Sequence, residues 1–147
     1  MAITFNTTAL NIANNTFDLA SDTFYLELVT AAPAASVTTN ASLTKASGGN
    51  YAPVVLTNAS ATRVSAYGTG GTKLDFDDAA WSGLYTTAAT PIVGGVVCKR
   101  VGGSPATSDP VVAYSALNTS YVPATGAGTA TDFTFVFGAN GVLTIGS

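Results

Sequence analysis

The stretch TDFTFVFGANGVLTIGS, residues 131–147, decides the fold class of this chain. It places Phe133, Phe135 and Phe137 at alternate positions, and side chains in an extended strand alternate between its two faces, so all three rings point to one side. Three aromatic rings on one face strongly favour burial. The sequence therefore predicts a half-buried strand, and the Asn-Gly pair after it predicts a tight hairpin to a returning strand over residues 142–145.

Other short runs of β-branched and aromatic residues recur between turn-forming residues. The strands that they predict cover residues 23–30, 50–57, 64–67, 73–76, 90–101 and 110–117. In the first of them Phe24, Leu26 and Leu28 share one face, which we expect to be the buried one. Pro53 lies in the second and has no N–H to donate, so that strand is expected at a sheet edge or a bulge.

No segment shows the sustained period of a long helix. The sequence predicts an all-β fold: an antiparallel β-sandwich of about seven or eight strands, jelly-roll or Ig-like, with a partly closed barrel as the alternative. One domain is expected over residues 21–147, in which strand 110–117 pairs antiparallel with strand 90–101. Residues 1–20 have no clear period and predict an irregular N-terminal arm, although a short helix or an edge strand stays open. Residues 31–49 are rich in small residues and predict a long loop with one short helical turn.

The chain carries little charge. Of its 147 residues 47% are hydrophobic and only 9% are charged, against ~25% charged in typical soluble domains. Soluble proteins that act alone generally keep more surface charge, so this composition favours a protein that is packed in an assembly or lies outside a cell. The net charge of -3, with five basic residues and no histidine, excludes the clustered positive charge that a nucleic-acid partner requires. No window approaches the ~20 apolar residues of a membrane span, so no membrane partner is expected.

Residues that carry chemistry are few. The absence of histidine excludes Ser-His and Cys-His nucleophile pairs and a Cys/His zinc site. The single Cys98 cannot form an internal disulfide and is expected to be a buried strand residue. Asp75 and Asp77 would share one face of a strand, which allows an acid pair or calcium ligands, but an acidic run beside a turn is more typical of a solvated rim. We therefore predict no enzymatic activity, no cofactor and no metal site.

Three larger side chains have two interpretations each. Trp81 is either a sugar-stacking platform or an anchor in a core or an interface, and large aromatic residues more often take the second role. Lys99 and Arg100 end the strand over residues 90–101, where they either pair with acids of a partner chain or cap an exposed strand end.

Five segments in a fixed order resemble small virion proteins of tailed bacteriophages. They are GGNYAPVVL (48–56), KLDFDDAAWSG (73–83), IVGGVVCKRV (92–101), SDPVVAYSAL (108–117) and DFTFVFGANGVLTI (132–145). The resemblance covers roughly residues 20–147. There is one clear departure, because the family commonly has a tyrosine and an acid after its Ala-Val-Ile strand and this chain has Cys98, Lys99 and Arg100 there.

The resemblance implies a structural role in the virion. The leading expectation is a capsid decoration, or cement, protein that binds the outer surface of the head shell and stabilises contacts between major capsid protein subunits. Its partners are then the major capsid protein and itself, most naturally as a homotrimer at a symmetry axis. Apolar arms, long loops and prominent aromatic or basic side chains need a partner, which makes the candidate contacts Phe5, Phe17, Pro33, Lys45, Trp81, Lys99 and Arg100.

Two alternatives stay open at this point. The first is a phage tail, fibre or head-spike module that binds host surface glycans or a receptor, with Trp81 and exposed tyrosines as stacking platforms. The second is a hydrolase of cell-surface polymer that uses Asp75 and Asp77. For all three hypotheses we expect synthesis in the bacterial host cytoplasm, because no basic residue precedes Lys45 and the positive region of a secretory signal is therefore missing.

Overall fold

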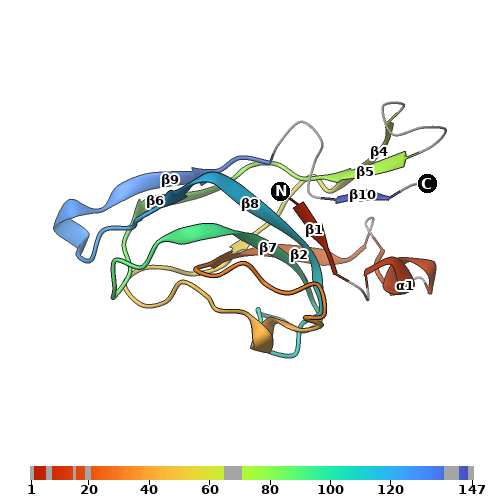
Figure 1. The fold of residues 1–147 in the computed structure, drawn as a ribbon, viewed down its shortest axis with the longest axis horizontal. Helices are drawn as coiled ribbons and strands as arrows, with labels where there is room; N and C mark the ends of the chain where they lie inside the picture. Colours follow the sequence, from red (N-terminus) through yellow and green to blue (C-terminus); the bar gives the residue numbers. More distant parts are fainter. Residues whose placement is uncertain are drawn as a thin grey trace.

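The computed structural model describes residues 2–5, 8–14, 16–18, 21–64, 71–137 and 143–145. These residues form ten strands, one short helix and two 3-10 turns, and the paired strands are antiparallel (Figure 1). The all-β class is therefore confirmed. The strand number exceeds the predicted seven or eight because the sequence pattern does not single out the short strands near the N-terminus and around Trp81. In the described part of the chain no helix is both long and apolar enough to cross a membrane.

The largest sheet has five strands in the order β1-β8-β7-β2-β3. The bounds are Ala2–Thr4 for β1, Val111–Tyr121 for β8, Ile92–Arg100 for β7, Thr23–Val29 for β2 and Val54–Val55 for β3. The predicted antiparallel pairing of β7 with β8 is confirmed, with Val96 opposite Tyr114. The edge position predicted for the strand over residues 50–57 is confirmed too, because β3, which begins directly after Pro53, stands at the end of the strand order.

Two smaller sheets complete the set, one with the order β10-β5-β4 and one that pairs β6 with β9. The bounds are Leu143–Ile145 for β10, Gly71–Asp75 for β5, Ser60–Val64 for β4, Ala79–Leu84 for β6 and Thr131–Phe135 for β9. The predicted hairpin between β9 and β10 is wrong: β9 places Phe133 opposite Trp81 of β6, and β10 pairs with β5. Alternating phenylalanines determine which face of β9 is buried, but they do not determine which strand lies beside it. The turn predicted over residues 138–141 lies outside the described residues.

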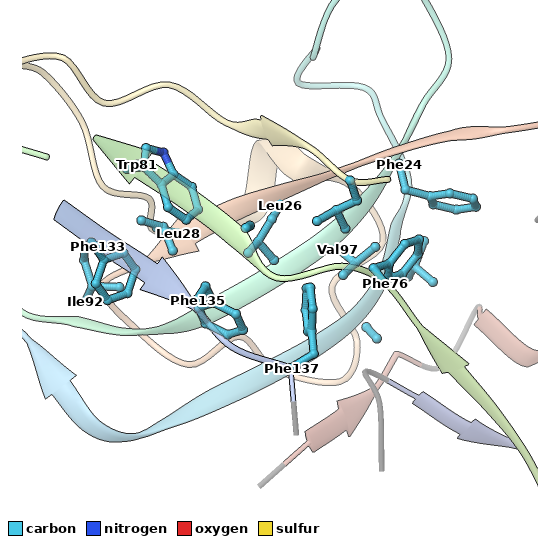
Figure 2. Packing of buried hydrophobic residues seen from close by; sticks show 14 of the residues in the cluster. Phe24, Leu26, Leu28, Phe76, Trp81, Ile92, Val97, Phe133, Phe135 and Phe137 are labelled. Carbon is cyan, nitrogen blue, oxygen red and sulfur yellow. The ribbon is translucent and has the colours of Figure 1, made fainter. Parts of the chain in front are cut away.

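The main hydrophobic core lies between the five-stranded sheet and the β6–β9 pair (Figure 2). Phe133, Phe135 and Phe137 all belong to it, as their alternation predicts, and the rings of Phe135 and Phe137 meet edge to face with centroids 5.4 Å apart. The intervening Val136 is 63% exposed whereas Phe135 is 1% exposed. From the large sheet the core receives Phe24, Leu26, Leu28, Ile92, Val97, Val112 and Ala113.

A second hydrophobic cluster covers the opposite face of the five-stranded sheet. It consists of Phe5, Tyr25, Val29, Leu43, Val96, Cys98, Val111 and Tyr114. Both faces of β2 are therefore buried, whereas the sequence pattern singles out only the face of Phe24. The cover comes from the loop over residues 31–49, which contains the predicted helical turn, η1 (Asn40–Ser42), and contributes Leu43 to the cluster. The backbone N–H of Asn40 donates to the carbonyl of Asp109 at 2.9 Å, so this loop is tied to the start of β8.

The described residues of the segment 1–20 pack on the domain. Its β1 pairs with β8 and is followed by the six-residue helix α1 (Thr8–Ala13), so the edge strand and the short helix that the sequence leaves open stand in place of an irregular arm. The Thr8 hydroxyl donates to the carbonyl of Val112 at 2.6 Å and anchors the helix to β8. Phe5 lies in the second cluster and Phe17 in the main core.

Candidate functional site

The predicted aromatic contact residues are core residues. Phe5 and Phe17 are buried in the two hydrophobic clusters. Trp81 is buried as well: its Nε1–H donates to the carbonyl of Ala52 at 2.8 Å, and its ring stacks on Tyr51 with centroids 6.4 Å apart. Trp81 is therefore a core anchor in this fold and offers no exposed face on which a sugar ring could stack.

The basic pair at the end of β7 is partly held by its own chain. The Nζ of Lys99 lies 2.7 Å from a carboxylate oxygen of Asp22 and 5.9 Å from the centre of the Phe17 ring. Arg100 is half-buried at the strand end, and Pro33 is half-buried in the loop that covers the second cluster. Because the three aromatic candidates are buried, the seven predicted contact residues do not form one surface.

The acidic run between β5 and β6 organises the local chain. Asp77 accepts hydrogen bonds from the hydroxyl of Thr57 at 3.2 Å and from the side-chain amide of Asn58. Asp78 accepts a hydrogen bond from the N–H of Phe137 at 3.0 Å, which fixes the chain after β9. Among the described residues no group of three or more His, Cys, Asp or Glu side chains is placed to hold a metal ion. These contacts are those of a structural rim.

A groove of about 450 Å³ lies between β8 and the β9 segment. Its lining consists of Ser115, Ala116, Leu117, Asn118, Thr119, Thr134 and Val136. Thr134 and Val136 reach it because they alternate with the buried phenylalanines and so face away from the main core. Figure 1 shows β8 and β9 running close together over one end of the molecule.

Among the described strands, both walls of this groove have an edge along which no further strand pairs. The described part of β1 covers β8 as far as Ser115, which stands opposite Ala2, and β8 continues beyond it to Tyr121. β9 pairs with β6 along one edge, and among the described strands none pairs with its other edge. Backbone N–H and C=O groups on open edges can accept an added strand from another chain.

The groove is also free of charge. Its lining consists of hydroxyl, amide and apolar side chains. From Pro110 to Ser147 the sequence contains a single charged residue, Asp132. A partner would therefore be recognised here by shape, by apolar contact and by neutral hydrogen bonds, because the side chains offer no charge for electrostatic steering.

A network of buried polar side chains lies beneath the loop over residues 31–49. Asp109 is fully buried at its centre. One carboxylate oxygen of Asp109 accepts the N–H of Val101 at 3.1 Å, and the other accepts the N–H of Ala106 at 2.8 Å and the hydroxyl of Tyr25 at 3.0 Å. Three donors thus hold one carboxylate, as a buried acid requires.

Glu27 is the second buried acid of the network and is 4% exposed. Its Oε2 accepts the hydroxyl hydrogen of Tyr51 at 2.8 Å, and the same hydroxyl oxygen accepts the N–H of Leu28 at 2.8 Å. Its Oε1 accepts a hydrogen bond from Nδ2 of Asn40 at 3.1 Å and lies 3.9 Å from Nζ of Lys45. The Nζ of Lys45 in turn donates to Oδ1 of Asn40 at 2.9 Å, which closes a triangle of three side chains.

Several groups around this network are held in their neutral form. Burial, reinforced by the negative charge of Glu27, raises the pKa of the Tyr51 hydroxyl and of the Cys98 thiol. Burial is also the main reason that the pKa of Tyr25 is raised. Cys98 is a free, fully buried thiol, so the expectation of a buried strand cysteine is confirmed and a reactive thiolate is disfavoured.

Sequence reasoning finds Lys45 but not the residues that surround it. The available signal is Glu27, a lone acid in the otherwise apolar and hydroxyl-bearing run TFYLELVT, because a charge in a buried strand needs partners. Nothing in the sequence pattern indicates that Asn40 and Tyr51 supply them. The chain matches no protein-family model, and no curated protein or solved structure is significantly similar to it.

Proposed function

We propose that this chain is a capsid decoration, or cement, protein of a tailed bacteriophage that binds the outside of the head shell and bridges major capsid protein subunits. The observation that carries the proposal is the uncharged groove between β8 and β9 with its open strand edges. The centre of a stable interface is depleted of charged residues, so a surface of this kind suits lasting contact with a partner. The low charge of the whole chain supports the same conclusion.

The resemblance to small phage virion proteins supports this role from another direction. The five segments that carry it include β5, β6, β7, β8 and β9, and prominent members such as Phe76, Trp81 and Tyr114 are buried. The shared residues therefore stabilise the core of the fold. A partner can contact only exposed side chains, and those of the groove are the ones that we propose as the contact surface.

Cementing requires contact and no chemical reaction. DNA packaging loads the shell from inside, and a protein that spans the joint between coat subunits stabilises the shell by burying on the order of 800 Å² per partner. An extended coat segment added to the open edge of β9 gains main-chain hydrogen bonds, and the groove hydroxyls add side-chain bonds. We propose a closed trimer at a symmetry axis as the assembled form, because cyclic symmetry lets every copy make the same contact.

The test is to add the purified protein to head shells that lack it and to examine the shells by cryo-EM. We expect many symmetric copies on the outer surface and a higher temperature of shell rupture. Val136→Lys and Asn118→Lys place a charge in the groove and should each weaken binding at least tenfold, because an unpaired charge is costly to bury. Ser104→Lys makes the same change in the exposed turn before β8 and should bind like the wild type.

Two outcomes would overturn parts of this proposal. Absence of density on the shell, together with a few copies at the tail or a spike, would remove the cement role and favour the host-binding alternative. Symmetric binding that is insensitive to both groove substitutions would retain the role and remove the groove as the contact surface.

A further inference from the structure

The triangle of Glu27, Asn40 and Lys45 brings an amine, a carboxamide and a carboxylic acid together, with the amide and the acid buried and the lysine side chain 28% exposed. The Nζ of Lys45 lies 2.9 Å from the amide oxygen of Asn40, which is the atom bonded to the carbon that the amine would attack. Reacting groups held in contact in a fixed orientation gain a large part of the rate enhancement of an enzyme. The hydrogen bond therefore holds the amine beside the amide group, which amide exchange between the two side chains requires.

The amide of Asn40 is oriented for such a reaction. Its Nδ2 faces the Oε1 of Glu27 at 3.1 Å, the Tyr25 hydroxyl at 2.8 Å and the carbonyl of Ala106 at 3.2 Å. These acceptors place the nitrogen on the side of the carboxyl group and leave the oxygen toward Lys45. The nitrogen that has to leave thus lies beside the group that can give it a proton.

Glu27 is placed to carry protons between the two nitrogens. Tyr51 holds its Oε2, and its Oε1 is directed at Nδ2 of Asn40 and lies 3.9 Å from Nζ of Lys45. A carboxyl group within reach of both the nucleophile and the leaving group can act first as base and then as acid. Asn40 is 2% exposed and Glu27 is 4% exposed, so water has little access to the amide carbon, although the Lys45 side chain itself is 28% exposed.

We propose that Lys45 and Asn40 form an intramolecular isopeptide bond, with Glu27 as the proton carrier. Glu27 takes a proton from the Lys45 ammonium, and the neutral Nζ attacks Cγ of Asn40. The Nζ–Cγ bond forms, Glu27 moves a proton from the attacking nitrogen to Nδ2, and the Cγ–Nδ2 bond breaks with release of ammonia, which leaves as ammonium. The net change is an alkylammonium and a primary amide converted into a secondary amide and ammonium, with no oxidant or reductant.

The bond would make the loop cover permanent. It closes the chain between residues 40 and 45, on either side of Leu43, which inserts into the second hydrophobic cluster. The turn η1 could then no longer unwind from the sheet by fraying. This inference stands independently of the proposed cement function, because it concerns only groups within one chain.

Mass spectrometry of the denatured wild-type protein is the deciding experiment. We expect an intact mass lower than the sequence mass by one ammonia, after allowance for the initiator methionine. The tryptic map gives a second readout, because Lys45 is the first basic residue and Arg63 the next. An acylated Lys45 blocks cleavage, so the N-terminal peptide should be residues 1–63 less ammonia, with residues 1–45 absent.

Three variants assign the roles. Lys45→Met and Glu27→Gln should each keep the full sequence mass, with folding verified by circular dichroism, and Lys73→Met should retain the loss of ammonia as the matched control. Retention of the loss in Lys45→Met would show a succinimide at an asparagine and would overturn the proposal. A folded Glu27→Gln protein that still loses ammonia would remove the assigned role of Glu27. A wild-type protein with full sequence mass and a 1–45 peptide would overturn the bond itself, whatever the variants do.

Discussion

Asp109 depends on both oxygens of its side chain. It is fully buried and accepts two backbone N–H groups and the Tyr25 hydroxyl, divided between Oδ1 and Oδ2. Asp109→Asn turns one of these acceptors into a donor that faces another donor. We expect a loss of about 1–3 kcal/mol in the free energy of unfolding, measured by urea denaturation, because a buried donor is left without an acceptor.

Asp132→Asn is the matched control for that substitution. Asp132 is exposed, and its Oδ1 accepts both the N–H of Gly83 at 2.8 Å and the hydroxyl of Ser82 at 3.3 Å. An asparagine can present its single carbonyl oxygen to both donors, so we expect a change within about 0.5 kcal/mol. Equal losses in the two variants would contradict the assignment of Asp109 as the centre of the buried network.

Phe135 and Val136 are sequence neighbours with opposite environments, 1% and 63% exposed. Phe135→Ala removes a ring from the middle of the main core and leaves a cavity, so we expect about 3–5 kcal/mol of destabilisation. Val136→Ala removes exposed carbon atoms and should change stability by less than about 0.5 kcal/mol. Urea titrations of both variants measure the difference, and similar midpoints would contradict the burial pattern of β9.

At the scale of the element, β7 depends on two adjacent glycines that let neighbouring groups approach its backbone. A Cβ on Gly94 would lie 2.5 Å from a ring carbon of Tyr114 and 2.6 Å from the carbonyl oxygen of Ser115. Gly94→Ala therefore forces β8 or the tyrosine ring to move, and we expect a loss of about 1–3 kcal/mol. Gly103→Ala, in the turn between β7 and β8 with nothing within 4 Å, is the control and should be nearly neutral by thermal melting.

The elements also show what a single sequence can predict. Alternation in β9 predicts its buried face correctly, because a strand exposes alternate sides whatever its neighbour is. The partner of β9 is not predictable in the same way, since the Asn-Gly pair favours a local hairpin and the real neighbour, β6, comes from far along the chain. Strand pairing at long range is decided by packing of specific side chains, such as Trp81 against Phe133, and this packing leaves no periodic signal.

The same limit applies to the candidate sites. Lys45 lies in a loop whose length suggests that it docks on something, and the surface on which it docks is β2 of the same chain. The triangle with Asn40 and Glu27 joins a loop to a strand, so its geometry exists only after the chain has folded. The groove between β8 and β9 depends in turn on how two sheets are placed, and only the scarcity of charge after Asp109 points to it in advance.

Over the whole molecule, buried hydroxyl and thiol groups couple stability to alkaline pH. Burial raises the pKa of Tyr25, Tyr51 and Tyr114 above the ordinary 10.0 and that of Cys98 above 9.0. Above those ordinary values the unfolded chain releases these protons while the folded chain keeps them. The unfolded state then binds fewer protons, and the free energy of unfolding decreases as pH rises. Below about pH 8 both states are protonated at these groups, so they contribute almost no slope there.

Urea denaturation from pH 8 to pH 11 tests this coupling. We expect little contribution from these groups at pH 8, a first decline near pH 9 from the Cys98 thiol, and then a decline that approaches about 1.4 kcal/mol per pH unit for each group that stays protonated only in the fold. Tyr51→Phe removes one such group, so its stability should start lower at pH 8, because the bonds to Glu27 and Leu28 are lost. Above pH 10 its decline should be shallower than that of the wild type by about 1.4 kcal/mol per pH unit. Parallel slopes in the two proteins would show that the Tyr51 hydroxyl ionises as readily in the folded chain as in the unfolded one, and would remove it from the set of groups that set the alkaline limit.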